Sequence, residues 1–164
     1  MNKAGIVAFA FGVPWNIRSN QRIAGIAENK AIDLSAPVYT QKDVHIDLIS
    51  AVTYTEEELG HPPPSLRMAR GAVRWACTRR ITDLWVVAAR PHISRCMRDL
   101  IKAVEQSGRQ ISIHVCQEEI DQFPEDLWFC LNSTQPRTRS RQAWERRERI
   151  FRYLPFWLYK IVAS

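Results

Sequence analysis

His92 and Arg95 stand three residues apart, just after the apolar run 83–89, and their side chains suit an anionic ligand. The run predicts a buried strand and Pro91 predicts a helix start, which would place the pair at the carboxyl edge of a sheet. Free N–H groups at the helix start would attract negative charge, and the spacing puts both side chains on one helix face. Arg95 could grip a phosphate or carboxylate in its planar fork.

We assign His92 a catalytic role, because imidazole can exchange a proton near neutral pH, or the donation of a hydrogen bond to phosphate. Ser94 lies between the two residues and could orient the same ligand. A simpler interpretation stays open, in which His92 only caps the helix and Arg95 pairs with a surface carboxylate.

The loop after the first apolar run offers a second group of donors at the same predicted edge of the sheet. Gly12 would form the turn, and Asn16 and Arg22 would contribute to ligand binding. The loop matches neither the GxGxxG nor the GxxxxGK[ST] phosphate-binding pattern. A capped turn with solvated polar groups would explain these residues equally well.

Asp43, His45 and Asp47 alternate with apolar residues and are metal-compatible side chains. On a strand they would face one way. Isolated patterns of this kind are common, so we interpret the segment as an amphipathic edge strand with a wet face and predict no metal.

The last quarter of the chain is strongly basic. Its seven arginines are Arg137, Arg139, Arg141, Arg146, Arg147, Arg149 and Arg152. Apolar residues recur there at near-helical spacing, namely Trp144, Phe151, Leu154 and Leu158. An anionic membrane surface is a possible partner and nucleic acid an unlikely one. We favour a terminal helix that packs its apolar stripe on the sheet, with Glu145 and Glu148 pairing with Arg149 and Arg152.

Composition supports a globular protein with an anionic partner. The formal net charge is +6 and the isoelectric point about 9.5, which favours phosphorylated molecules or acidic surfaces. The chain contains no GxSxG or HExxH motif, and the sequence predicts no particular cofactor. Its four cysteines have no CxxC spacing, which indicates reduced thiols and a cytoplasmic location.

The elements that must position these residues alternate between strand and helix. Strands are predicted at 5–11, 83–89 and 111–116, and helices at 19–30, 64–80, 91–108 and 141–153, with a break at Pro155. Residues 37–48 could hold one or two more strands. This alternation predicts a single α/β domain over 1–164, with a three-layer Rossmann-like fold, a mainly parallel sheet and a basic C-terminal helical region at 141–163. The run 5–11 is too short for a membrane span and lacks a cleavage site, so we interpret it as a strand rather than a signal peptide.

These motifs resemble the YdcF/SanA/ElyC-like bacterial family, which carries a domain of unknown function. Phe11-Gly12 with Arg22 resembles its first turn, and Ala89, His92 and Arg95 resemble its H-x-x-R motif after a buried strand. Arg147-Glu148 before Phe151 resembles its closing segment. Residues 39–42 replace the Ser-Gly-Gly turn of the family. The resemblance implies a Rossmann-like α/β/α fold and a divergent soluble member, but no settled reaction.

Two functions follow as hypotheses from the sequence. The first is the binding of a phosphorylated or nucleotide-like small molecule at the carboxyl edge of the sheet, anchored by Arg95 and Arg22. The second is a non-catalytic interaction module that uses the basic, aromatic C-terminal helix.

Overall fold

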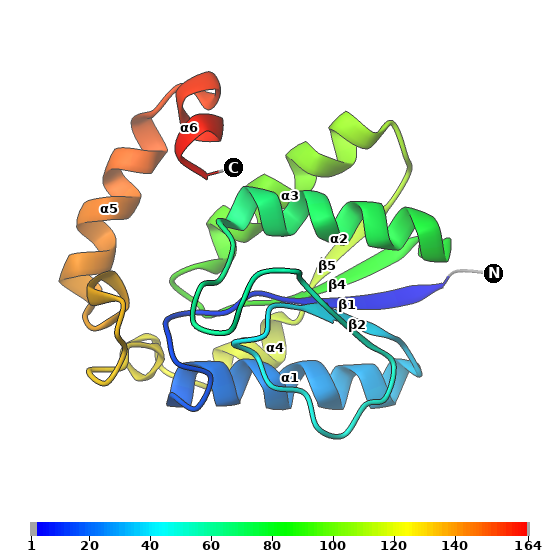
Figure 1. The fold of residues 1–164 in the computed structure, drawn as a ribbon, viewed down its shortest axis with the longest axis horizontal. Helices are drawn as coiled ribbons and strands as arrows, with labels where there is room; N and C mark the ends of the chain where they lie inside the picture. Colours follow the sequence, from blue (N-terminus) through cyan, green and yellow to red (C-terminus); the bar gives the residue numbers. More distant parts are fainter. Residues whose placement is uncertain (1–2, 164) are drawn as a thin grey trace.

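The computed structural model describes residues 3–163, and it has the α/β architecture that the sequence predicts. Five parallel strands form one sheet in the order β3-β2-β1-β4-β5 (Figure 1). The strands are β1 (Ala4–Ala8), β2 (Val38–Thr40), β3 (Val52–Tyr54), β4 (Asp83–Val87) and β5 (Ser112–Val115). Because the order reverses between β1 and β4, the strand ends diverge at that point and leave a crevice, as in other doubly wound sheets.

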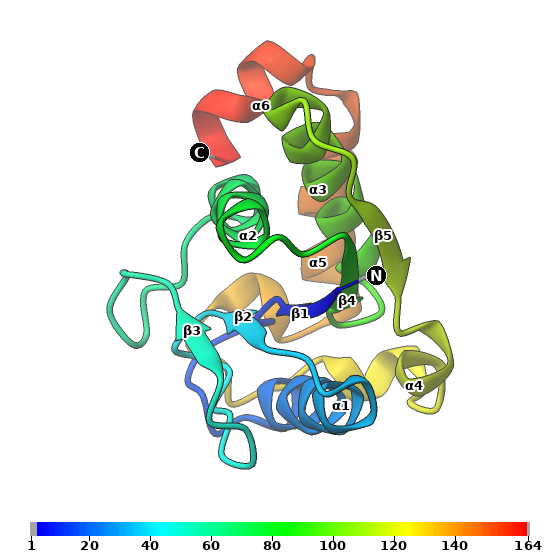
Figure 2. The same cartoon turned by 90° about the vertical axis from the view of Figure 1, so that its right-hand side faces the viewer.

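Helices cover both faces of the sheet and make three layers, which Figure 2 shows end on. The layer helices are α1 (Arg18–Leu34), α2 (Ser65–Arg79), α3 (Ile93–Ser107) and α4 (Gln117–Asp121). Helices α2 and α3 pack on one face, with Leu84 and Val86 in a common apolar core. Helix α1 packs on the other face, where Ile6 and Val87 meet Ile23. The central strands therefore bury both faces, which explains their continuous apolar sequence.

The remaining elements lie beyond the carboxyl ends of the strands. They are the 3₁₀ helices η1 (Glu125–Trp128) and η2 (Pro136–Thr138), followed by α5 (Arg141–Tyr153) and α6 (Phe156–Ala163). Figure 1 shows α5 and α6 at the end of the molecule toward which β1 runs. The basic region 141–163 is thus two helices, interrupted at Pro155 as the sequence indicates. None of the described helices is long and apolar enough to cross a membrane.

The predicted amphipathic strand around Asp43 is wrong. The segment between β2 and β3 is a loop in which the Asp47 N–H donates to the Glu28 carboxylate of α1 at 2.6 Å. Asp43 is buried and accepts a hydrogen bond from the Gly60 N–H at 3.0 Å, whereas His45 is exposed. Asp43 therefore does not share the exposed side of His45 and Asp47, which pair with each other at 2.8 Å. Within residues 3–163, no group of three or more His, Cys, Asp or Glu side chains could hold a metal ion.

Candidate functional site

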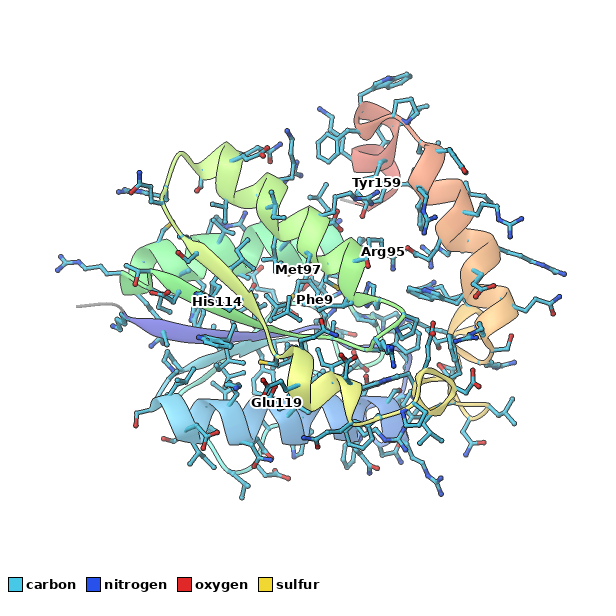
Figure 3. All side chains as sticks on the ribbon, turned by 180° about the vertical axis from the view of Figure 1, so that it is seen from behind. Phe9, Arg95, Met97, His114, Glu119 and Tyr159 are labelled. Atoms are coloured by element: carbon cyan, nitrogen blue, oxygen red, sulfur yellow. The ribbon has the colours of Figure 1, made fainter. Side chains whose placement is uncertain are left out.

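A cavity of about 260 Å³ opens at the carboxyl edge of the sheet. The chain after β1 and β2 forms its floor, the start of α3 forms one wall, and η2, α5 and α6 close the opposite side. Its basic and amide side chains are Gln41, His92, Arg95, Gln135, Arg137 and Arg147, and none of the described lining residues is Asp or Glu. In Figure 3, Arg95 lies between α3 and α5, with Tyr159 of α6 and Phe9 nearby.

In the turn after β1, backbone N–H groups donate to side-chain oxygens instead of to a neighbouring strand. The Ala10 N–H donates to Gln41 Oε1 at 2.6 Å, and the Phe11 N–H donates to Asn20 Oδ1 at 2.9 Å. The sheet ladder therefore stops near Ala8, and the chain bends into the cavity floor. Gly12 follows with a φ of 93°, a conformation that side chains other than glycine rarely adopt. Gly12 lines the cavity, and its N–H has no acceptor within residues 3–163; its predicted role in ligand binding stays a prediction.

His92 is buried between aromatic rings beside Arg95. Its Nε2 lies 3.0 Å from Arg95 Nη2, and a guanidinium can only donate, so Nε2 accepts and the proton sits on Nδ1. That Nδ1 atom is buried, with no acceptor in the described part of the chain. Burial, followed by the charge of Arg95, lowers the pKa of His92 well below its ordinary value. His92 is therefore a neutral imidazole with an unused N–H donor.

Arg95 is held in place by contacts with α5. Its Nη1 donates to Glu148 Oε1 at 2.5 Å, and its guanidinium lies over the rings of Trp144 and Phe151, at 4.9 and 5.3 Å from the ring centres. Its Nε is buried without an acceptor in the described residues. The carboxylate that Arg95 binds is thus a partly buried residue of α5 behind the cavity lining, not a residue of the open surface.

Two further arginines, Arg137 and Arg147, line the same cavity, and the sequence does not predict them as site residues. Burial and the charge of Arg95 lower the pKa of Arg137, while burial and both neighbouring guanidiniums lower the pKa of Arg147 to about 10. Neither forms an ion pair with a described carboxylate. Among the described residues, Glu148 is the only carboxylate that forms an ion pair with any of these three guanidiniums, so the cavity carries a net positive charge.

A sequence signal for Arg147 does exist. Trp144, Arg147 and Phe151 recur at i, i+3 and i+7, so Arg147 belongs to the buried face of the C-terminal helix and not to its solvated side. Trp144 and Phe151 are buried as the apolar stripe predicts. The predicted pairing of the two glutamates is wrong, because Glu148 reaches Arg95 and Glu145 lies 3.9 Å from Arg141.

The predicted free amides at the start of α3 are mostly absent. The N–H groups of His92 and Ile93 both donate to the Ala89 carbonyl, at 2.8 and 3.0 Å. Ser94 is exposed and does not line the cavity. The positive character of this edge therefore comes from guanidinium groups and not from the helix terminus.

Asn16 and Arg22 lie elsewhere in the structure. Both line a separate cavity between the start of α1 and the chain after η1. The guanidinium of Arg22 donates to the Leu127 carbonyl and lies 5.1 Å from the ring centre of Phe123. Of the residues predicted to form the site, the structure thus brings together His92, Arg95 and Gly12.

A buried carboxylate fixes α6 over the cavity. Asp99 of α3 accepts hydrogen bonds from Ser65 Oγ at 2.7 Å and from Tyr159 Oη at 2.6 Å. Ser65 and Tyr159 both line the cavity. Burial raises the pKa of Asp99, and burial together with the Asp99 charge raises the pKa of Tyr159 to about 12. The network joins α2, α3 and α6 at the rim.

Comparison with known proteins leaves the site to be interpreted from its own geometry. No protein-family model matches the chain, and no curated protein matches its sequence. Membership of the YdcF-like family stays a prediction. The arrangement itself is chemically specific: a small cavity with three guanidiniums, one neutral imidazole donor and aromatic walls can hold an anion with several oxygen atoms.

Proposed function

We propose that this protein binds a phosphorylated small molecule, a class that includes nucleotides, in the cavity at the carboxyl edge of its sheet. The single observation that carries the proposal is the convergence of Arg95, Arg137 and Arg147 on a cavity whose described lining contains no carboxylate. Three clustered guanidiniums repel one another, and a ligand with two negative charges would relieve that repulsion.

The other lining groups support an oxyanion as the ligand. Guanidinium forks match phosphate oxygens in a bidentate manner, and His92 Nδ1 and the Gly12 N–H are donors without protein acceptors within residues 3–163. We assign His92 the role of a neutral hydrogen-bond donor. Its Nε2 lone pair is occupied by Arg95, so the resting imidazole is a poor general base.

The cavity size and walls indicate what accompanies the phosphate. A volume of about 260 Å³ lies just below the range for small-molecule sites, which begins at roughly 300 Å³, so the ligand must be small. The rings of Phe11 and Trp144 lie against His92, with ring centres 5.9 and 5.2 Å away. A phosphate group with a compact apolar or planar substituent fits this lining. The four free thiols support a reducing compartment such as the cytoplasm.

The test is calorimetric titration with inorganic phosphate, pyrophosphate and a nucleoside monophosphate at constant ionic strength. We expect saturable binding of at least one of these to the wild-type protein. Arg147→Met and Arg137→Gln should each weaken it by about tenfold or more, because each removes a charge-assisted hydrogen bond.

Arg22→Gln provides a matched control, because this arginine contacts the separate cavity. It should bind the same probe with wild-type affinity. The proposal fails if none of the three probes binds saturably, or if Arg22→Gln weakens binding as much as Arg147→Met.

A further inference from the structure

The side of α5 opposite the cavity carries an exposed, apolar and basic face. Arg146, Arg149, Ile150 and Tyr153 recur at i, i+3, i+4 and i+7, which places them on one side of the helix. Ile150 is 64% exposed and Tyr153 79% exposed. Single exposed apolar side chains are ordinary, but Ile150 and Tyr153 are neighbours at i, i+3, and contiguous exposed apolar side chains mark interaction surfaces.

Helix α6 adds further exposed apolar side chains. Trp157 and Ile161 are one helical turn apart and are 62% and 69% exposed, and Lys160 lies exposed between them. Tyr159 points to the other side and is held by Asp99. The hydrogen bond fixes the orientation of α6, so the exposure of Trp157 follows from the packing of the helix.

The positive charges on this surface are not neutralised within residues 3–163. No ion pair joins Arg146, Arg149 or Lys160 to a described carboxylate. The two glutamates of α5 are occupied, because Glu145 approaches Arg141 and Glu148 binds Arg95. The face therefore combines bulky apolar side chains with free cations.

We propose that this face of α5 and α6, defined by Arg146, Arg149, Ile150, Tyr153, Trp157, Lys160 and Ile161, docks the protein on the surface of an anionic lipid bilayer. Charge complementarity favours a surface rich in acidic headgroups. Tyr and Trp side chains partition to the interface between headgroups and acyl chains, where Ile150 and Ile161 would enter the hydrocarbon boundary.

A lipid surface explains the composition better than nucleic acid or a second copy of the chain. A phosphate backbone would use the arginines but would gain nothing from exposed Ile150 and Ile161. A second copy would bring the same cations against Arg146 and Arg149 across a twofold axis, and like charges would oppose the contact. None of the seven residues that define the face lines the cavity, so the proposal does not depend on ligand binding there.

Co-sedimentation of the full chain with vesicles tests the proposal. We expect binding to vesicles of phosphatidylcholine mixed with phosphatidylglycerol, and far weaker binding to vesicles of phosphatidylcholine alone. The double substitution Arg146→Gln/Arg149→Gln should weaken partitioning by about twenty-five-fold, because each basic residue near an anionic surface contributes about fivefold. Trp157→Ala should weaken it independently of salt, since it removes apolar contact.

A control of equal charge is available at the far end of the molecule. Arg79 and Arg109 are exposed near the amino edge of the sheet, and Arg79→Gln/Arg109→Gln removes the same charge from that region. This variant should bind acidic vesicles like the wild type. The proposal is overturned by equal binding to neutral and acidic vesicles, by an equal loss in the control, or by a concentration-dependent dimer that Trp157→Ala abolishes.

Discussion

Replacing Arg147 by Met should stabilise the ligand-free protein and at the same time weaken its binding of phosphate by about tenfold or more. Burial and two neighbouring guanidiniums lower the pKa of Arg147 to about 10. A folded-state pKa below the unfolded value means that this positive charge opposes folding at all pH values below about 10, and that stability rises as the pH passes above it. The unbranched apolar side chain of Met should retain most of the packing that the methylene groups of Arg147 make.

The magnitude follows from that pKa change. At about 1.36 kcal/mol for each unit of pKa change, the charge would lower the free energy of unfolding by roughly 3 kcal/mol if the site excluded water completely. Arg147 keeps contact with solvent, which reduces the cost by about half. Loss of its position over Phe151, 4.7 Å from the ring centre, removes about 0.5–1 kcal/mol of stabilisation. The net gain is about 1 kcal/mol, or roughly 2–4 °C in the melting temperature.

Thermal melts of wild type and Arg147→Met, with and without phosphate, provide the assay. The variant should melt higher in phosphate-free buffer, and saturating phosphate should raise the melting temperature of the wild type by more than that of the variant. Arg146→Met is the matched control, because Arg146 is exposed on the opposite face and should change stability by less than about 0.5 kcal/mol. A variant that melts lower than the wild type without phosphate would refute the reasoning.

Three further predictions concern the cavity walls. Burial lowers the pKa of His92, so only the unfolded chain gains this proton as the pH drops below about 6.5, and the free energy of unfolding should fall by up to about 1.4 kcal/mol per pH unit. Urea unfolding at several pH values should show a shallower dependence of that free energy on pH for His92→Gln. Equal dependence in the two proteins would contradict the assignment. Gly12→Ala should destabilise by about 2 kcal/mol or more, because φ is 93° and the new Cβ would lie 2.8 Å from Thr138 Oγ1; an unchanged melting temperature would count against it. Tyr159→Phe removes a donor from buried Asp99 and should destabilise α6 by about 1–3 kcal/mol, seen as faster amide exchange in residues 156–162 with unchanged exchange in α3; uniform exchange would show that α6 is held by other contacts.

The sequence predicts the fold well where both faces of a strand are buried. The runs that become β1 and β4 are apolar on both sides, so they could be assigned to central parallel strands without tertiary information. Alternation misleads between β2 and β3. Val44 and Ile46 are buried there as a strand would bury them, but the segment is a loop that donates backbone N–H groups to Glu28. The alternation of apolar residues indicates which side chains are buried, but the backbone hydrogen bonds determine whether the segment is a strand or a loop.

Only one wall of the candidate site could be predicted from the sequence, namely the wall formed by a single continuous segment. His92 and Arg95 follow directly from a strand that leads into a helix, and the structure places both in the cavity. Arg137 and Arg147 are more than forty residues away in the sequence, among other arginines of similar appearance. Only the register of Trp144 on the same helix face distinguishes Arg147 from the exposed arginines beside it. The sequence indicated the charge of the tail but not which part of it turns inward.

The division of the basic tail into two faces connects both proposals. Helix α5 has a buried face, where the charge of Arg147 lies near that of Arg95, and an exposed face, where Arg149 has no acidic partner among the described residues. Apolar residues alone would be enough to pack the buried face of a helix of this length. A guanidinium on that face destabilises the ligand-free protein, because a buried charge without a close partner is costly. The arrangement is therefore consistent with a ligand that neutralises the inner charge, while the outer charge remains available for a surface.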